Sequence, residues 1–186
     1  KIDSSVVAKM GGQAGAAMQR KKDEDYLSIF STFASGTSPG TGNPLSHGHI
    51  AASKNRITSN VTEPSMAQVF GVFHGYGIYD LQVEQTAPIG TYPTPEGLTE
   101  EFYRQGFRGT VAGVNIFEDG NITVDATPDG RGSVHAKDGV LAIIAMDLKK
   151  ETDRDISFGG GADVISLVDE YAFAENRSGT AGTTQV

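Results

Sequence analysis

The stretch that decides the fold is SVVAKMGGQAGAAMQRKKDEDYLSIFSTF, residues 5–33. Apolar side chains recur in it every three or four residues, first in its N-terminal half and again from Tyr26. This spacing predicts one long helix. Gly11, Gly12 and Gly15 each cost about 1 kcal/mol relative to Ala inside a helix. We therefore expect the helix to be held by packing against another element.

A charged segment, QRKKDED at residues 19–25, separates the two apolar stripes. Its basic residues precede its acidic residues by three or four positions, so ion pairs within the run are expected. Such pairs add little stability where they are exposed. The segment therefore predicts a solvated turn of helix or a contact with a polar partner.

Beyond this helix, segments rich in Gly, Pro, Ser and Thr break the chain at residues 34–44 and 86–97. The second break is interpreted as an ordered loop. The last residues, 178–186, are low in complexity and are expected to be mobile. Composition and periodicity predict the following further elements: a helix capped by Ser46 and running to Ser59, a buried strand Ala67–Phe73, a short helix Gly77–Val83, a helical turn Leu98–Gln105, a strand Phe107–Asp119 bent at Gly113, a turn at Asp119–Asn121, another at Pro128–Gly130, a central strand Val140–Leu148, a polar connection over 149–155, and a long strand Asp163–Glu175 with Ile165, Leu167, Tyr171 and Phe173 on one face. This order indicates an α+β fold rather than a regular βαβ alternation.

Composition limits the classes of function. The 186 residues can bury a substantial core, and the absence of Cys excludes disulfides, thiol catalysis and Cys-based zinc sites. A net charge of −8 argues against a general nucleic-acid binder. The first 60 residues hold seven of the 15 basic and four of the 23 acidic residues, so the acidic surplus lies in the remainder. No apolar run approaches the roughly 20 residues that span a bilayer, and the N-terminus lacks the apolar core of a signal peptide.

The histidines do not predict a metal site. His47 and His49 lie two residues apart at a helix start, which is not the spacing that places two imidazoles on one helical face. His74 is expected at the end of a strand and His135 in a loop. All four histidines are therefore interpreted as surface or turn residues.

Two glycine-containing segments resemble binding motifs only superficially. Residues 119–130 have Val124 where a calcium loop needs Gly and Gly130 where it needs Glu, so a turn between strands is expected. Residues 159–161 are three glycines that precede a strand rather than a helix, which favours a hinge or β-bulge over a phosphate site.

Catalytic arrangements are equally weak. The chain has no GxSxG nucleophile motif. Glu100–Glu101 and Asp169–Glu170 are acidic pairs, but neighbours in a strand point to opposite faces, so Asp169 and Glu170 are not expected to share a site. Nothing in these residues predicts an enzyme or a bound cofactor.

The order of segments resembles a known family. The stretches that carry the resemblance are KKDEDYLSIFSTF, LSHGHIAASKNRITSN, VTEPSMAQVFGVFHGYGIYDL, FRGTVAGVNIFEDGNI, VHAKDGVLAIIAMDL and DVISLVDEYAFAENR. Together they look like the C-terminal two-thirds of a tailed-bacteriophage major capsid protein with the Hong Kong 97-type coat fold. The chain departs from the family at Gly75, where Pro is usual, and in its glycine-rich spine helix. The N-terminal arm and extended loop of the family are expected to be missing from this chain.

The resemblance implies a division into a peripheral-domain spine helix (1–40), an axial domain (41–155), a strand that returns to the peripheral domain (156–177) and a flexible tail (178–186). It places residues 71–97 near the axis of a capsomer. The candidate inter-subunit contacts are Arg20, Lys21, Lys22, Asp23, Glu24, Asp25 and Tyr92.

The implied function is that of a structural coat protein, not an enzyme. Such subunits self-assemble into hexamers and pentamers of an icosahedral phage head around double-stranded DNA, without sequence-specific binding. The implied location is the virion, with assembly in the host cytoplasm and no membrane association. Scaffold, portal and decoration proteins are further partners that the resemblance allows.

Three alternatives remain open at this stage. A cellular encapsulin-like nanocompartment shell would share the fold and differ in cargo. A soluble acidic α+β hydrolase would be a monomer or small oligomer with a concave carboxylate site. An extracellular β-rich binding module fits less well, because the chain has a long N-terminal helix and no signal segment.

Overall fold

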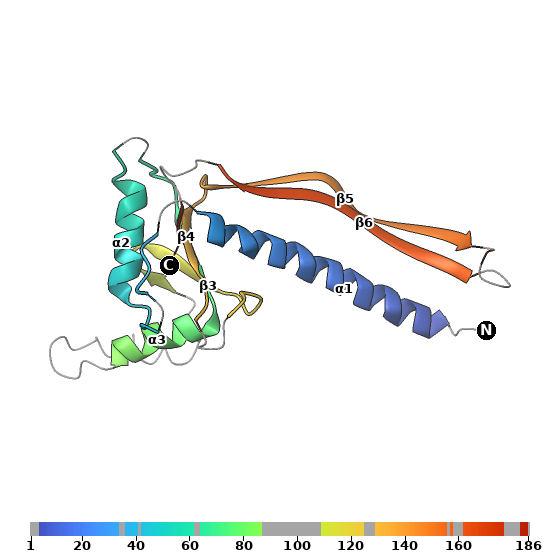
Figure 1. Ribbon diagram of the computed structural model, residues 1–186, viewed down its shortest axis with the longest axis horizontal. Helices are drawn as coiled ribbons and strands as arrows, with labels where there is room; N and C mark the ends of the chain where they lie inside the picture. Colours follow the sequence, from blue (N-terminus) through green and yellow to red (C-terminus); the bar gives the residue numbers. More distant parts are fainter. Residues whose placement is uncertain are drawn as a thin grey trace. The chain divides into compact units, whose positions relative to one another are not determined.

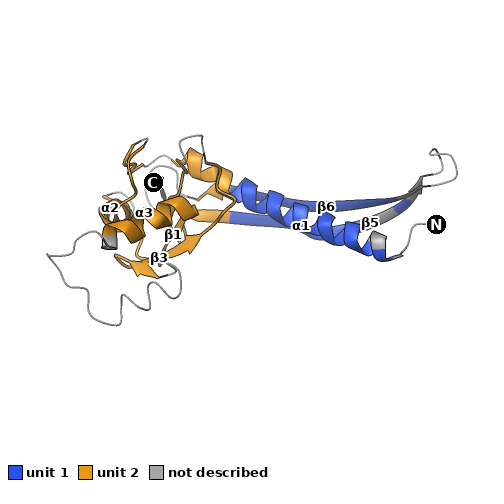
Figure 2. Cartoon of the chain, turned by 90° about the horizontal axis from the view of Figure 1, so that it is seen from below, with its two compact units in different colours: residues 1–26, 142–173 blue, residues 27–141, 174–186 orange. Residues whose placement is uncertain are grey.

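The computed structural model describes residues 4–33, 36–40, 42–61, 64–86, 109–124, 129–155, 157, 162–176 and 183–185 (Figure 1). The chain forms two compact units (Figure 2). Unit 1 comprises Lys1–Tyr26 and Ala142–Phe173, and unit 2 comprises Leu27–Leu141 and Ala174–Val186. The sequence predicted boundaries after residues 40, 155 and 177. Those boundaries refer to the domains of a capsid subunit rather than to compact units, so that division stays a prediction.

Unit 1 consists of a helix lying along a two-stranded antiparallel ribbon. The predicted long helix is confirmed as α1 (Ser4–Ser28), which continues as the 3₁₀ helix η1 (Ile29–Thr32). The ribbon pairs β5 (Val140–Asp155) with β6 (Ala162–Glu175). Figure 1 shows α1 running beside both strands. The half-buried stripe of α1 is Gly11, Ala14, Gly15, Met18 and Lys22, at the spacing expected for one helical face.

The ribbon differs in one respect from the sequence expectation. The long strand over Asp163–Glu175 is confirmed as β6, but the polar connection expected over residues 149–155 is instead the second half of β5. The strand predicted over Val140–Leu148 is confirmed as the first half of β5, but its predicted central place is wrong. Among the described strands β5 pairs with β6 alone, and Ile143 and Ile144 are each 53% exposed. Charged residues are tolerated in this strand because the ribbon faces solvent there.

Unit 2 is built on a five-stranded sheet of order β2-β3-β1-β4-β7. Strands β1 and β3 are parallel, and the other three pairs are antiparallel. The strands are β1 (Val69–Phe73), β2 (Thr110–Val111), β3 (Val114–Glu118), β4 (Ser133–Ala136) and β7 (Thr183–Gln185).

One face of this sheet packs against α2 (His47–Thr58) and α3 (Gly75–Thr86). Both helices and strand β1 were predicted and are confirmed, and so is the Ser46 cap. The buried core consists of Leu45, Ile50, Ile57, Val69, Phe73, Ile78, Leu81, Val111, Val114, Ile116, Val134 and Ala136. Because side chains alternate along a strand, Phe70 lies on the opposite face, where its ring contacts His135 of β4.

The strand expected over Phe107–Asp119 is instead a tight hairpin within the part of it that is described. The chain does not bend at Gly113 but reverses between β2 and β3, with Val111 opposite Val114. Ala112 (φ 49°) and Gly113 (φ 77°) both have positive φ, as the favoured two-residue hairpin turns require. Lys54 Nζ of α2 donates to the Ala112 carbonyl at 2.7 Å and stabilises this turn.

Two further expectations are wrong. His135 lies not in a loop but in β4, where it is buried. Residues 183–185 of the expected mobile tail form β7, because the edge of β4 offers unpaired backbone groups and Thr favours strands.

The predicted turn at Asp119–Asn121 is confirmed, with the Asn121 amide donating to Asp119 Oδ1 at 2.8 Å. The expected loop over residues 87–97, the turn at 98–105, Pro128 and the glycines 159–161 lie outside the described residues.

Candidate functional site

The charged turn of α1 is fixed onto β6 within unit 1. Lys22 Nζ lies 3.2 Å from Asp169 Oδ2 and 5.0 Å from the centre of the Tyr171 ring. The Tyr171 hydroxyl donates to Asp25 Oδ2 at 2.8 Å. One position further along α1, Tyr26 packs edge-on against Phe173. These contacts combine an ion pair, a cation–π contact and an aromatic pair in one cluster.

Asp169 is the buried member of this cluster. Its side chain is 5% exposed, and Oδ1 has no hydrogen-bond partner among the described residues. Its neighbour Glu170 is exposed, which confirms that these two carboxylates do not share a site. Sequence reasoning missed the partnership of Asp169 with Lys22, which are 147 positions apart. The available signal was the alternation of β6, which places Asp169 on the same face as Tyr171 and Phe173.

The exposed charges of α1 pair within the helix, as the sequence predicted. Arg20 contacts Glu24 at 2.9 Å and Lys21 contacts Asp25 at 2.5 Å, each four positions apart. Hydrogen bonds from Lys21 and then from Tyr171 hold the pKa of Asp25 below its usual value. The same bond to Asp25 raises the pKa of Tyr171. Asp23 also lies on this turn, whereas Tyr92 lies outside the described residues.

The ribbon carries apolar side chains on both of its faces. Ile143 and Ile144 are consecutive in β5 and each is 53% exposed. Val164 and Ile165 are consecutive in β6 and each is 38% exposed. Since consecutive strand residues point to opposite faces, the described residues of unit 1 leave apolar side chains exposed on both faces of the ribbon. The set of exposed apolar residues on the ribbon is Leu141, Ile143, Ile144, Leu148, Val164 and Ile165.

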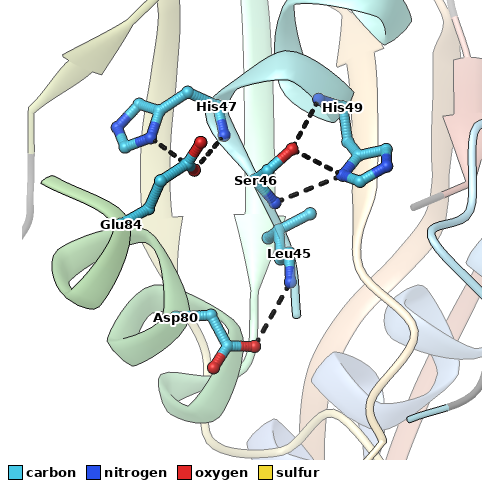
Figure 3. A network of polar contacts seen from close by, with 6 residues as sticks. All are labelled: Leu45, Ser46, His47, His49, Asp80 and Glu84. Carbon is cyan, nitrogen blue, oxygen red and sulfur yellow. Dashed lines mark hydrogen bonds and ion pairs between the residues drawn. The ribbon is translucent and has the colours of Figure 1, made fainter. Parts of the chain in front are cut away.

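In unit 2, polar contacts connect the start of α2 to α3 (Figure 3). Asp80 and Glu84, one turn apart on α3, accept hydrogen bonds from the Leu45 and His47 amides at 3.3 and 2.7 Å. His47 Nδ1 also lies 2.8 Å from Glu84 Oε2. Burial by itself would raise the pKa of Glu84, but the hydrogen bonds and charge of His47 outweigh it, so the pKa lies below its usual value.

The described residues offer little for catalysis or metal binding. In these ranges, His, Asp and Glu side chains nowhere form a group of three or more that could hold a metal ion. Ser46 Oγ lies 2.7 Å from His49 Nδ1, but the same oxygen accepts from the His49 amide and so caps α2. Among the described residues, no helix combines the length and apolar character needed to cross a membrane.

Unit 1 is a long helix along a two-stranded ribbon, and unit 2 is a small α+β unit. The chain has the Hong Kong 97-type coat fold. The fold class and the long spine helix expected from the resemblance are therefore confirmed.

Three solved structures share this fold. A structure from Mycobacterium phage Che8 matches with a TM-score of 0.65 and 16% identity over 98% of this chain and 62% of that chain. The holo-SrpI encapsulin complex from Synechococcus elongatus PCC 7942 matches with a TM-score of 0.63 and 12% identity over 96% of this chain and 64% of that chain. The capsid of the cyanophage P-SCSP1u matches with a TM-score of 0.60 and 13% identity over 100% of this chain and 66% of that chain.

The chain thus spans less than two thirds of the length of each of these three structures. No protein-family model and no curated protein matches the sequence. The likeness therefore concerns the fold, and the function is a separate inference.

Proposed function

We propose that this chain is a structural coat protein whose copies assemble into the hexamers and pentamers of an icosahedral phage head around double-stranded DNA. Its role is architectural rather than enzymatic. Its location is the virion, after assembly in the host cytoplasm, and scaffold, portal or decoration proteins join the same particle.

The observation that carries this proposal is the incompletely covered ribbon of unit 1. A long two-stranded ribbon is marginal in water by itself, and a chain that exposes apolar side chains on both of its faces needs a further layer. The fold is that of proteins described as a capsid and an encapsulin complex. We therefore assign the uncovered face to a second copy of this chain.

The charge of the chain is consistent with a shell that encloses DNA. A net charge of −8 limits adhesion of the subunit to the phosphate backbone, so the genome is enclosed rather than bound at specific sequences. Many weak contacts between copies are sufficient for a stable shell, because each subunit is held by several neighbours at once.

Particle size provides the direct test. Expression of the protein is expected to give particles tens of nanometres across in negative-stain images and light scattering. Ile143→Glu, at a 53% exposed position, is expected to block assembly while the subunit keeps its circular dichroism spectrum. Gln68→Glu adds the same charge at an exposed position of unit 2 and serves as the control. The proposal is contradicted if the wild-type protein remains a stable monomer. It is also contradicted if Ile143→Glu assembles as well as the Gln68→Glu control.

The charged turn Arg20–Asp25 is proposed as a second contact between copies. A charge swap separates the internal pair from a contact with a neighbour. If Arg20 acts only on Glu24, Arg20→Glu combined with Glu24→Arg restores the pair and the assembly. If Arg20 also meets a carboxylate of a neighbour, the swapped variant folds normally but assembles poorly, which is the result we expect.

Tyr92 is proposed to lie near the capsomer axis, in the segment 71–97. A Cys introduced at Tyr92 is expected to form disulfide-linked subunits in particles under oxidising conditions. A Cys at Gln68 in the same particles measures the background of random cross-linking. Equal cross-linking at both positions rejects the placement.

The second candidate is a cellular nanocompartment shell, favoured by the 0.63 TM-score to the encapsulin complex. Nuclease-protected DNA in purified particles supports the phage head, and protein cargo without DNA supports the nanocompartment. The acidic hydrolase alternative predicts no large particle, so the same size measurement distinguishes it.

A further inference from the structure

We propose that the start of α2 is held by a clasp of two parts. The part made by His49 is controlled by a proton: it is closed when His49 is neutral and loosened when His49 takes up a second proton, while the part made with α3 is retained. The clasp lies entirely within unit 2 and does not depend on the proposed function. Figure 3 shows its members: Leu45, Ser46, His47, His49, Asp80 and Glu84.

The first component is an unusual capping box. In the common form, a Glu or Gln at the third helical position accepts from the N-cap amide. Here His49 occupies that position, and its Nδ1 accepts from the Ser46 amide at 3.3 Å. Because a backbone N–H can only donate, Nδ1 must present its lone pair, and the proton of the neutral ring lies on Nε2. The Ser46 hydroxyl, 2.7 Å from the same nitrogen, is then its second donor.

The second component has the opposite requirement. His47 Nδ1 lies 2.8 Å from Glu84 Oε2, and an ionised carboxylate only accepts, so this Nδ1 must carry a proton. The bond is compatible with a neutral or a protonated His47 ring. The Nδ1 atoms of these two histidines therefore differ in protonation: that of His47 carries a proton, and that of His49 does not.

Proton uptake has a directional effect. A protonated His49 donates from both ring nitrogens, so the Ser46 amide loses its acceptor. The added positive charge also lies at the positive end of the α2 dipole. The bonds from Asp80 to the Leu45 amide and from Glu84 to His47 are retained. The start of α2 then keeps its bonds to α3 and the half of the capping box in which Ser46 Oγ accepts from the His49 amide, and it loses the half made by the His49 ring. The titratable groups that face the clasp are His47 and His49 from α2 and Asp80 and Glu84 from α3.

The predicted readout is local opening of the first turn of α2. Hydrogen-exchange protection of the His49 and Ile50 amides is compared between about pH 8 and about pH 5, the range in which imidazoles ordinarily titrate. Loss of an N-cap interaction predicts that protection falls on the order of fivefold at the lower pH. Protection factors are used because they remove the intrinsic pH dependence of exchange.

Three variants test the assignment in the full chain. His49→Gln keeps a capping-box acceptor that does not titrate, so protection at these amides is expected to become independent of pH. His47→Gln is the matched control, and its pH dependence is expected to persist. Ser46→Ala removes the cap at every pH and is expected to give low, pH-independent protection.

Nitrogen NMR shifts of the imidazole rings report the tautomers directly, with His49 expected as the Nε2–H form at high pH. The proposal is overturned if His49 carries its proton on Nδ1 at high pH, or if His49→Gln retains the full pH dependence.

Discussion

The buried imidazole of His135 makes the stability of unit 2 depend on pH. His135 is 7% exposed in β4, with its ring centre 6.1 Å from that of Phe30 and 6.4 Å from that of Phe70. One of its polar contacts is with Ser133, whose Oγ lies 3.1 Å from Nδ1. Burial in this aromatic environment lowers the pKa of His135 from 6.5 to about 4.

The sign and size of the effect follow from linkage. The unfolded chain takes up the proton near pH 6.5, before the folded chain does, so stability is full above that pH and falls as the pH decreases. The loss is about 1.4 kcal/mol per pH unit and levels off below the folded pKa of about 4, at a total of about 3 kcal/mol. Between pH 7.5 and pH 5 we expect the free energy of unfolding to fall by about 2 kcal/mol from this group.

The assay is urea unfolding at pH 7.5, 6 and 5, where carboxylates are mostly ionised. His135→Gln cannot titrate, so the difference in pH slope between it and the wild type isolates His135, whatever the substitution costs at constant pH. His74→Gln, which changes a less buried histidine, controls for loss of an imidazole. Identical slopes for the wild type and His135→Gln would refute the reasoning.

Three further substitutions test packing and charge. Gly12→Ala places a Cβ that meets nothing within 4 Å, so thermal unfolding should show a gain of about 1 kcal/mol, and a loss contradicts this. Gly132→Ala places a Cβ in overlap with the Phe73 ring and 2.9 Å from the Val72 carbonyl oxygen, so denaturant unfolding should show a loss of about 1–3 kcal/mol; an unchanged midpoint would disprove the overpacking. Lys22→Met leaves the 5% exposed Asp169 unpaired and should cost about 3 kcal/mol, which Asp169→Leu in the same chain should largely restore; no restoration would show that the charge is not the cause.

The parts of the fold that the sequence predicted are those whose signals are local. The periodicity of α1 and the alternation of β6 each extend over many residues, so one mismatch does not obscure them. Ser46 predicts a helix start because an N-cap interaction involves only neighbouring residues. These elements needed no knowledge of long-range contacts.

The elements that were missed depend on partners far along the chain. Strand β4 has four residues and β7 has three, too short for a periodic signal. The charged half of β5 is a strand because β6 pairs with it, not because its own residues favour one. The hairpin at Ala112–Gly113 was interpreted as a bend because only Gly113 signalled a positive φ. Ala112 adopts one as well, in the turn that Lys54 stabilises.

The candidate contacts of α1 also divide into local ones, which the sequence predicted, and long-range ones, which it did not. The pairs four residues apart on α1, such as Arg20 with Glu24, were expected from spacing. The buried pair of Lys22 with Asp169 was not, because one strand residue offers no indication of which helix crosses it. A charged turn in a sequence therefore predicts that partners exist, but only the topology identifies them.

The glycines of α1 lead to a conclusion about how this helix is held. The sequence suggested that a helix with Gly11, Gly12 and Gly15 must be secured by packing, yet a Cβ at any of the three would meet nothing within 4 Å. Tight packing against the ribbon is thus not the reason for these residues, and their combined cost of about 3 kcal/mol must be offset elsewhere. Among the described residues of unit 1, Lys22 and Tyr26 make contacts with β6 that are capable of this. The charged segment, expected to be a solvated turn or a contact with a polar partner, therefore contacts polar partners on β6 through Lys22 and Asp25 and helps to attach α1 to the ribbon.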